Sequence, residues 1–321
     1  MKATRLACGV VAGLVLATGA IADDPPAGEP AQYPPVEQAP AKVDTPAELA
    51  AWSAEHRGEI EEIAGAKFAA DVPVKVATTE ELAERISLSI QRDMLGAVRP
   101  DGRPMSAVEI RIRSMAAAFK VATRTFGMYS HEDRVVYVAP ENVAKYAKKF
   151  GWSAETVERA PRLAVAHEMV HALQDQRADL GERLAHLSGE ERAGLTAVSE
   201  GQAVWVTDRL AKKLDWGAAN AVLWGVIAGG RDEEDSAAKA AAAPKIGVAP
   251  AGELYALGKK FMESRAEHKG DGPTGAERLW EIVRNPPKTL DELRAPDTSE
   301  AKKPGAEDSS ASGETRPSGK P

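Results

Sequence analysis

The chain has 321 residues, of which 43% are hydrophobic and 28% are charged, so wholesale disorder is excluded and one large or two small domains are allowed. Its formal net charge is −7 and the sequence contains no dense basic patch, which argues against nucleic acid as a partner. A single cysteine excludes an intramolecular disulfide framework, a four-cysteine zinc site and an iron–sulfur cluster. Any bound metal ion must therefore be held by histidines and carboxylates.

Residues 1–22 have the pattern of a secretory signal peptide. Two basic residues precede an apolar run over 6–21, and the small residues Ala20 and Ala22 predict cleavage before Asp23. The run is shorter than the roughly 20 apolar residues that span a bilayer comfortably. We therefore expect an exported protein, periplasmic or secreted, with no stable membrane span after signal cleavage.

The rest of the sequence consists of three segments that differ in composition. Residues 23–43 are rich in Pro and Ala and predict a disordered linker, and residues 295–321 predict a disordered polar tail. One folded domain is expected between them, over 44–294. Apolar periodicity and repeated helix-start signals, a Ser or Thr followed three residues later by Glu, predict helices over 46–69, 79–95, 107–123, 141–149, 161–176, 189–214 and 252–265.

Two segments have β character. Valines alternate over 72–76, as they do in a half-buried strand. Residues 126–129 and 134–138 flank a polar stretch and predict a hairpin, which Pro140 ends. A few strands separated from many helices indicate a helix-rich α+β fold with a small mixed or antiparallel sheet rather than a doubly wound parallel sheet.

One motif contains residues that could bind a metal ion and activate water. Residues 166–176 read AHEMVHALQDQ, and helical spacing places His167 and His171 one turn apart on the same face, where both imidazoles can reach one ion. Glu168 lies about 100° further round the helix, so its carboxylate can reach a metal-bound water without replacing a ligand. This is the H-E-x-x-H arrangement, in which zinc lowers the pKa of the water to about 7 and the Glu takes its proton. The alternative is that the histidines only pack or cap.

A catalytic zinc ion needs a third protein ligand and an open position. A third His six residues after the motif is excluded because Arg177 stands there. Glu200 is the strongest candidate, because it lies in an apolar stretch of the next long helix, where an unpaired carboxylate would cost several kcal/mol to bury. Gly201 beside it costs about 1 kcal/mol relative to Ala, which a close helix approach would explain. A solvated or ion-paired Glu200 is the alternative, with the ligand role then open to Asp175, Asp179 and His186.

Residues 167–176, HEMVHALQDQ, and 199–203, SEGQA, resemble bacterial H-E-x-x-H metallopeptidases of the gluzincin group, whose third ligand is a Glu on a later helix. The hairpin ahead of the motif is similar to part of the zincin fold, in which an edge strand pairs with the substrate backbone. The resemblance implies a zincin-like metallopeptidase domain in which His167, His171 and Glu200 bind Zn²⁺ and Glu168 is the general base. It also implies that a peptide pairs with the strand over 134–138.

The resemblance has departures. In thermolysin-like members an Asp four residues after the ligand Glu orients a ligand His, but Val204 stands at that position. Asp175, one turn after His171, is the candidate for this orienting role. Tyr255 and His268 are the candidates for stabilising the oxyanion beside the metal.

The sequence thus predicts an exported zinc metallopeptidase that hydrolyses peptide bonds in a peptide or protein substrate by Glu168-assisted attack of a zinc-bound water. Two alternatives stay open: a non-catalytic envelope binding or scaffold protein on a zincin-like fold, and a hydrolase of a non-peptide amide. Cleavage specificity, endopeptidase or exopeptidase action, a pro-segment role for 23–43 and the oligomeric state are not predicted.

Overall fold

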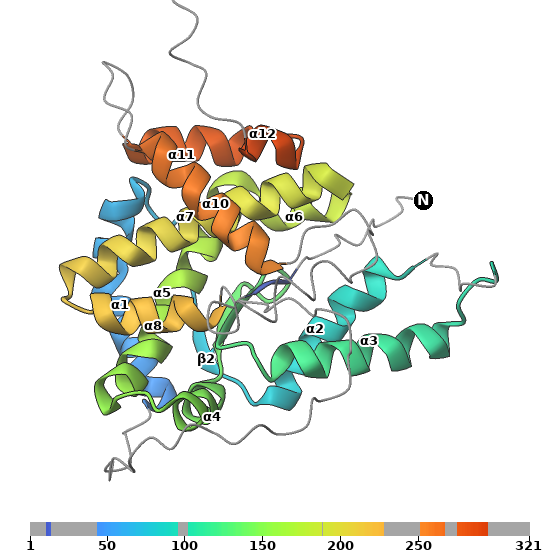
Figure 1. Cartoon of the computed structure of the whole chain (residues 1–321), viewed down its shortest axis with the longest axis horizontal. Helices are drawn as coiled ribbons and strands as arrows, with labels where there is room; N and C mark the ends of the chain where they lie inside the picture. Colours follow the sequence, from blue (N-terminus) through green and yellow to red (C-terminus); the bar gives the residue numbers. More distant parts are fainter. Residues whose placement is uncertain are drawn as a thin grey trace, which may run out of the picture.

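The computed structural model describes residues 11–13, 44–95, 102–187, 189–227, 251–266 and 275–294. This part of the chain is helix-rich with a small mixed sheet, which confirms the predicted α+β class (Figure 1). The predicted linker and tail, and all of the predicted signal peptide except 11–13, lie outside it. Among the described residues, no helix is both long enough and apolar enough to cross a membrane.

The predicted elements occur in the predicted order, but the strand over 11–13 and the helices over 180–186, 275–284 and 290–294 were not predicted. The strands are β1 Val11–Gly13, β2 Val74–Val76, β3 Gly127–Ser130 and β4 Val135–Val138. The helices are α1 Pro46–Ala64, α2 Thr79–Asp93, α3 Ala107–Ala122, α4 Pro140–Phe150, α5 Ala154–Ala178, α6 Leu180–His186, α7 Gly189–Lys213, α8 Gly217–Ile227, α10 Ala251–Ala266, α11 Gly275–Arg284 and α12 Leu290–Arg294.

Two predicted helix boundaries were wrong for local reasons. Helix α1 ends at Ala64 rather than at 69, because Gly65 adopts a left-handed backbone conformation with φ of 66°. Helix α5 begins at Ala154 rather than at 161, because the Ser153 hydroxyl caps it by accepting the N–H of Thr156. Pro161 therefore lies inside α5 and not at its start.

The sheet has the strand order β1-β3-β4-β2. The predicted hairpin is confirmed, with β3 antiparallel to β4, while β1 pairs antiparallel with β3 and β2 pairs parallel with β4. Strand β4 is therefore interior, and the prediction that 134–138 form an edge strand was wrong. The hairpin pattern reveals the β3–β4 pair only; the second neighbour of β4 comes from 74–76, far away in the sequence.

The two faces of the sheet are covered by different helices. Met128 and Tyr137 lie in a hydrophobic cluster with residues of α2 and α3, whereas Tyr129 and Val136 lie in a cluster with residues of α1 and α5. Successive side chains on a strand point to opposite faces, which accounts for this division. The sheet thus separates the α2–α3 pair from the helices that carry the motif (Figure 1).

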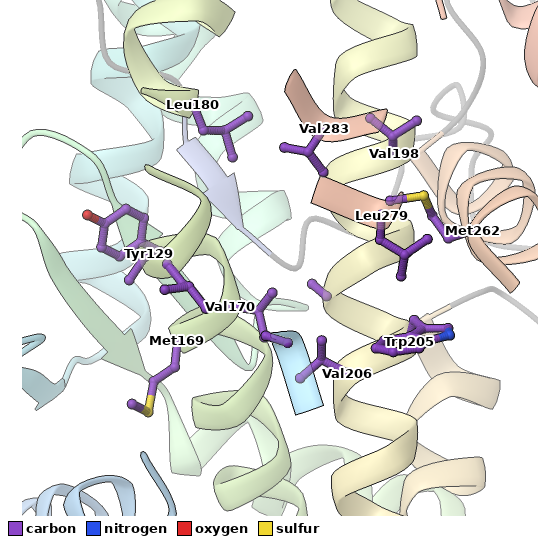
Figure 2. Packing of buried hydrophobic residues seen from close by; sticks show 14 of the residues in the cluster. Tyr129, Met169, Val170, Leu180, Val198, Trp205, Val206, Met262, Leu279 and Val283 are labelled. Carbon is purple, nitrogen blue, oxygen red and sulfur yellow. The ribbon is translucent and has the colours of Figure 1, made fainter. Parts of the chain in front are cut away.

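The main core lies between α5, α7 and the C-terminal helices. Val170 of α5 and Val206 of α7 belong to the same cluster as Met262 (Figure 2). Helix α10 approaches α7 closely at Gly201, where an added Cβ would lie 2.3 Å from the carbonyl oxygen of Gly258. The expectation that Gly201 marks a close helix approach is confirmed. All residues of the described clusters fall between 49 and 293.

Candidate metal centre

Helix α5 carries the H-E-x-x-H motif through the interior of the molecule. His167, Glu168 and His171 are at most 1% exposed, and they are surrounded by apolar residues of the same helix such as Leu163 and Val170. Polar side chains are buried at this depth only when they have partners, because an unpaired buried charge is costly. The partner that the two imidazoles share, Glu200, comes from α7.

Glu200 of α7 meets both histidines. Its Oε2 lies 3.1 Å from His167 Nε2 and 3.2 Å from His171 Nε2, and the two Nε2 atoms are 3.1 Å apart. Two atoms that each lie about 2.0–2.1 Å from one tetrahedral zinc ion are about 3.3 Å apart. The triangle of ligand atoms therefore has nearly the size that a small divalent cation requires.

This group is the one cluster of three potential metal-ligating side chains found in the part of the chain that the structure describes. The alternative ligands lie elsewhere. Asp179 ends α5 in a left-handed conformation, and His186 is exposed and lies 2.9 Å from Glu182. The structure thus brings together the three residues predicted as ligands, and they can hold a metal ion.

Burial and charge act against each other in this cluster. Burial lowers the pKa of His167. Burial opposes protonation of His171 too, but the Glu200 carboxylate outweighs it and raises the pKa of His171 to about 9. For Glu200, burial favours the neutral acid, yet the two imidazoles lower its pKa to about 2. A cation bound here would replace the His171 proton as the charge that faces the Glu200 carboxylate.

Gln174 fixes the orientation of His171, a role that sequence reasoning missed. Its Oε1 lies 2.9 Å from His171 Nδ1, while its Nε2 donates to the carbonyl of Ser199 and to Gln202 Oε1. Because both amide donors are engaged by α7, Oε1 is the atom left to accept the Nδ1–H of His171. In the neutral imidazole, which is the form that binds a metal ion, this hydrogen bond would place the lone pair on Nε2, toward Glu200 and His167.

Asp175, the residue predicted for this orienting role, has other partners. It accepts hydrogen bonds from the Tyr129 hydroxyl and the Gly181 N–H, and its Oδ1 lies 3.0 Å from His131 Nδ1. The His131 contact is a close charge-pair distance rather than a well-aligned hydrogen bond. Gln174 and Asp175 both lie about one turn after His171 and point about 100° apart, and Gln174 is the one whose amide also bonds α7.

Glu168 is held against strand β3. Its Oε2 accepts the backbone N–H of Tyr129 at 2.8 Å. Tyr129 pairs with Val136 across the β3–β4 hairpin, and Val136 donates its N–H to Pro73 on the far side. The two N–H groups therefore point away from each other, as in a non-hydrogen-bonded antiparallel pair. The carboxylate of Glu168 consequently lies at the outer edge of β3, the edge that β1 pairs with.

Gly127 lets β3 come this close. A Cβ added at Gly127 would lie 2.9 Å from Glu168 Cγ and 3.4 Å from the Ala164 side chain. Contacts below 3.0 Å are not tolerated without a shift of the neighbouring group. A glycine at the start of β3 is thus required by the position of Glu168, a relationship that the local sequence pattern does not reveal.

Aromatic side chains flank His167. Its ring stacks on Tyr255 of α10 with ring centroids 6.3 Å apart, and it lies 5.2 Å from the ring of Trp224 of α8. The structure therefore brings Tyr255, one of the two candidates for oxyanion stabilisation, to the side of the cluster. The other candidate, His268, lies outside the described residues.

Neither a family model, nor a curated protein, nor a solved structure matches this chain.

Proposed function

We propose that the chain is an exported zinc-dependent peptidase with a zincin-like catalytic domain. One observation carries the proposal. Glu200 converges with His167 and His171 at metal-binding distances. Glu168, which directly follows His167 in α5, reaches the outer edge of β3. Three ligands, a separate carboxylate and a strand edge are the parts that metal-assisted peptide hydrolysis requires.

The donor set fits zinc. Two imidazole nitrogens and one carboxylate oxygen are typical protein ligands of a catalytic zinc ion, which keeps one position open. His167, His171 and Glu200 would hold the ion, with Gln174 fixing His171. When bound, zinc supplies Lewis acidity, which lowers the pKa of a coordinated water to about 7 and polarises the substrate carbonyl.

Glu168 is the proposed general base. Its carboxylate takes the proton of the attacking water and passes it to the leaving amine. The hydrogen bond from the Tyr129 N–H fixes the direction of the carboxylate, because that donor belongs to a strand and cannot turn away. Tyr255, stacked on His167, is the proposed donor to the oxyanion.

The outer edge of β3 is the proposed place for the substrate backbone. In the full-length chain β1 pairs there antiparallel, with Ala12 opposite Tyr129, which indicates that the edge accepts an extended segment in that direction. Residues 11–13 belong to the predicted signal peptide, so its removal would free the edge. A peptide in the same place would pass beside the Glu168 carboxylate.

The test compares zinc content and hydrolysis in four proteins that start at residue 23. We expect the unaltered chain to bind one zinc ion and to cleave an unfolded protein such as casein, with chelator abolishing cleavage. Glu168→Gln should keep the zinc and lose cleavage by at least a hundredfold. Glu200→Ala should lose zinc, while Glu182→Gln, on the exposed surface of α6, should change neither.

The outcomes separate the alternatives. Zinc binding without cleavage of casein or of a broad peptide library would favour a binding protein. Cleavage of a non-peptide amide alone would show that the substrate is such an amide and not a peptide. Unchanged casein hydrolysis by Glu168→Gln would contradict the role of that residue. Unchanged zinc content in Glu200→Ala would contradict the ligand assignment.

A further inference from the structure

Six of the seven large apolar side chains that are exposed among the described residues lie on the α2–α3 pair or just beyond α2. Four side chains of α3 are exposed by 37% to 68%, and Leu88 of α2 and Leu95 just beyond it by 51% and 71%. The four are Val108, Ile112, Met115 and Phe119. Scattered exposed apolar residues are ordinary in proteins, but a concentration on one element indicates an interaction surface.

The four residues of α3 form one stripe. Their spacings of four, three and four residues place them within about 60° of helix circumference, because each residue advances about 100°. The centre of the buried face of α3, which includes Ile110, Ser114 and Ala118, is rotated by about 130° from the centre of this stripe, and that face packs toward α2 and the sheet. The stripe is therefore not the continuation of the core.

Basic side chains border the stripe. Helix α3 carries Arg111, Arg113 and Lys120 against a single acidic residue, Glu109, with which Arg113 forms an ion pair at 3.0 Å. Helical spacing puts Arg111 on one flank of the stripe, and puts Lys120 on the other together with the Glu109–Arg113 ion pair; Arg111 and Lys120 are exposed. This basic helix belongs to a chain whose net charge is −7.

We infer that α3 docks on an anionic lipid surface, with the apolar stripe in the interface and Arg111 and Lys120 against the headgroups. An apolar stripe between basic flanks is typical of helices that lie in a bilayer interface, where long basic side chains extend to the lipid phosphates. A second copy of the chain is a poorer occupant, because stripes packed face to face would bring the basic flanks of both copies together.

The location of α3 is compatible with this docking. Figure 1 shows α2 and α3 side by side, and the sheet separates their clusters from those of α5 and α7. A membrane under α3 would therefore leave the metal centre on the other side of the sheet. The inference does not depend on the proposed hydrolysis, because none of the residues involved belongs to the candidate metal centre.

Vesicle co-sedimentation of the chain from residue 23 onward tests the inference, since this form lacks the apolar run of the signal peptide. We expect binding to vesicles of phosphatidylcholine mixed with phosphatidylglycerol, little binding to phosphatidylcholine alone, and weaker binding as salt rises. Ile112→Ser with Phe119→Ser should lower the partition coefficient by about tenfold or more. Arg111→Glu with Lys120→Glu should lower the partition coefficient by a similar factor.

A matched control is Lys148→Glu with Lys149→Glu on α4, which makes the same change of net charge on exposed side chains and should leave vesicle binding within about twofold of the unaltered protein. Thermal melting and zinc content should be the same in all variants, since none of the altered residues is buried. The inference is overturned if the unaltered protein ignores anionic vesicles, or if the stripe variant binds them equally well. A stripe-dependent dimer by light scattering, without vesicle binding, would also overturn it and assign the stripe to self-association.

Discussion

The backbone N–H of Tyr129 donates a 2.8 Å hydrogen bond to Glu168 Oε2, and this contact joins the sheet to the motif helix. It ties the proposed general base to the strand edge proposed for the substrate. A shift of β3 would therefore move the carboxylate and the peptide path together.

Gly127→Ala tests this coupling. The new methyl group would lie 2.9 Å from Glu168 Cγ, so either β3 or the Glu168 side chain must move. We expect kcat on a peptide substrate to fall by about ten- to a hundredfold with zinc content unchanged, because a misplacement of about 1 Å can cost this much. Gly58→Ala is the control, because a Cβ at Gly58 would meet nothing within 4 Å. Equal kcat values for the Gly127 variant and the unaltered chain would contradict the coupling.

The pairing of β1 with β3 leads to a prediction about chains with and without residues 1–22. Residues 11–13 occupy the edge on which Glu168 lies, so the full-length chain should bind an extended peptide less well than the chain that starts at residue 23. Comparing kcat/KM for one fluorogenic peptide on the two forms measures this, with zinc content as the check that both are loaded. The idea fails if the two forms have the same kcat/KM.

The sequence was sufficient for the parts of the site that follow helical spacing. His167 and His171 one turn apart, and Glu200 in an apolar stretch, were predicted from local pattern and from the cost of burying a carboxylate, and the structure brings them together. The helix-rich α+β class was predicted as well, because helix caps and short alternating strands are local signals.

The parts that sequence could not supply depend on which element packs against which. Strand β4 is interior because β2 joins its other side, and nothing in residues 134–138 reveals that neighbour. His131 lies in the polar turn of the hairpin, where an exposed side chain is the rule, yet its side chain is 3% exposed and Gly181 packs directly against it. The choice of Gln174 over Asp175 likewise depends on acceptors supplied by α7.

Gln174→Met should weaken zinc binding by about ten- to a hundredfold, the range typical of lost partners of ligand histidines. The substitution removes the acceptor for His171 Nδ1–H but keeps an apolar side chain of similar length in the buried site. Competition with a chelating dye measures the affinity directly. Gln174→Glu retains an acceptor oxygen and should bind zinc more tightly than Gln174→Met. Wild-type affinity in Gln174→Met would show that His171 does not need this partner.

Gly201→Ala should destabilise the fold by about 1–3 kcal/mol, because the added Cβ would lie 2.3 Å from a backbone oxygen of α10 and that helix cannot give way cheaply. Urea unfolding followed by circular dichroism measures the free energy of unfolding. Gly225→Ala on α8 adds the same methyl group where nothing lies within 4 Å and should be neutral or slightly stabilising. Equal effects of the two substitutions would exclude the close approach of α7 and α10 as the reason for Gly201.

Asp175 gives a pH-dependent prediction. Burial favours its neutral form, but the nearby His131 ring, the Gly181 N–H and the Tyr129 hydroxyl outweigh burial and hold the pKa of Asp175 below its usual value. An unfolded Asp titrates near about 3.9, so this stabilisation is fully present above that pH and is lost as pH falls through the lower pKa of the folded state.

Asp175→Asn should therefore destabilise the fold by about 1–3 kcal/mol at pH 7, with the difference from the unaltered chain shrinking below about pH 4. Urea unfolding at pH values from 7 down to 3, in chelator so that metal makes no contribution, gives both curves. Asp291→Asn, at a 92% exposed side chain, should make little difference at any of these pH values. If the difference in free energy of unfolding between Asp175→Asn and the unaltered chain stays constant down to pH 3, the Asp175 carboxylate does not stabilise the fold through its charge.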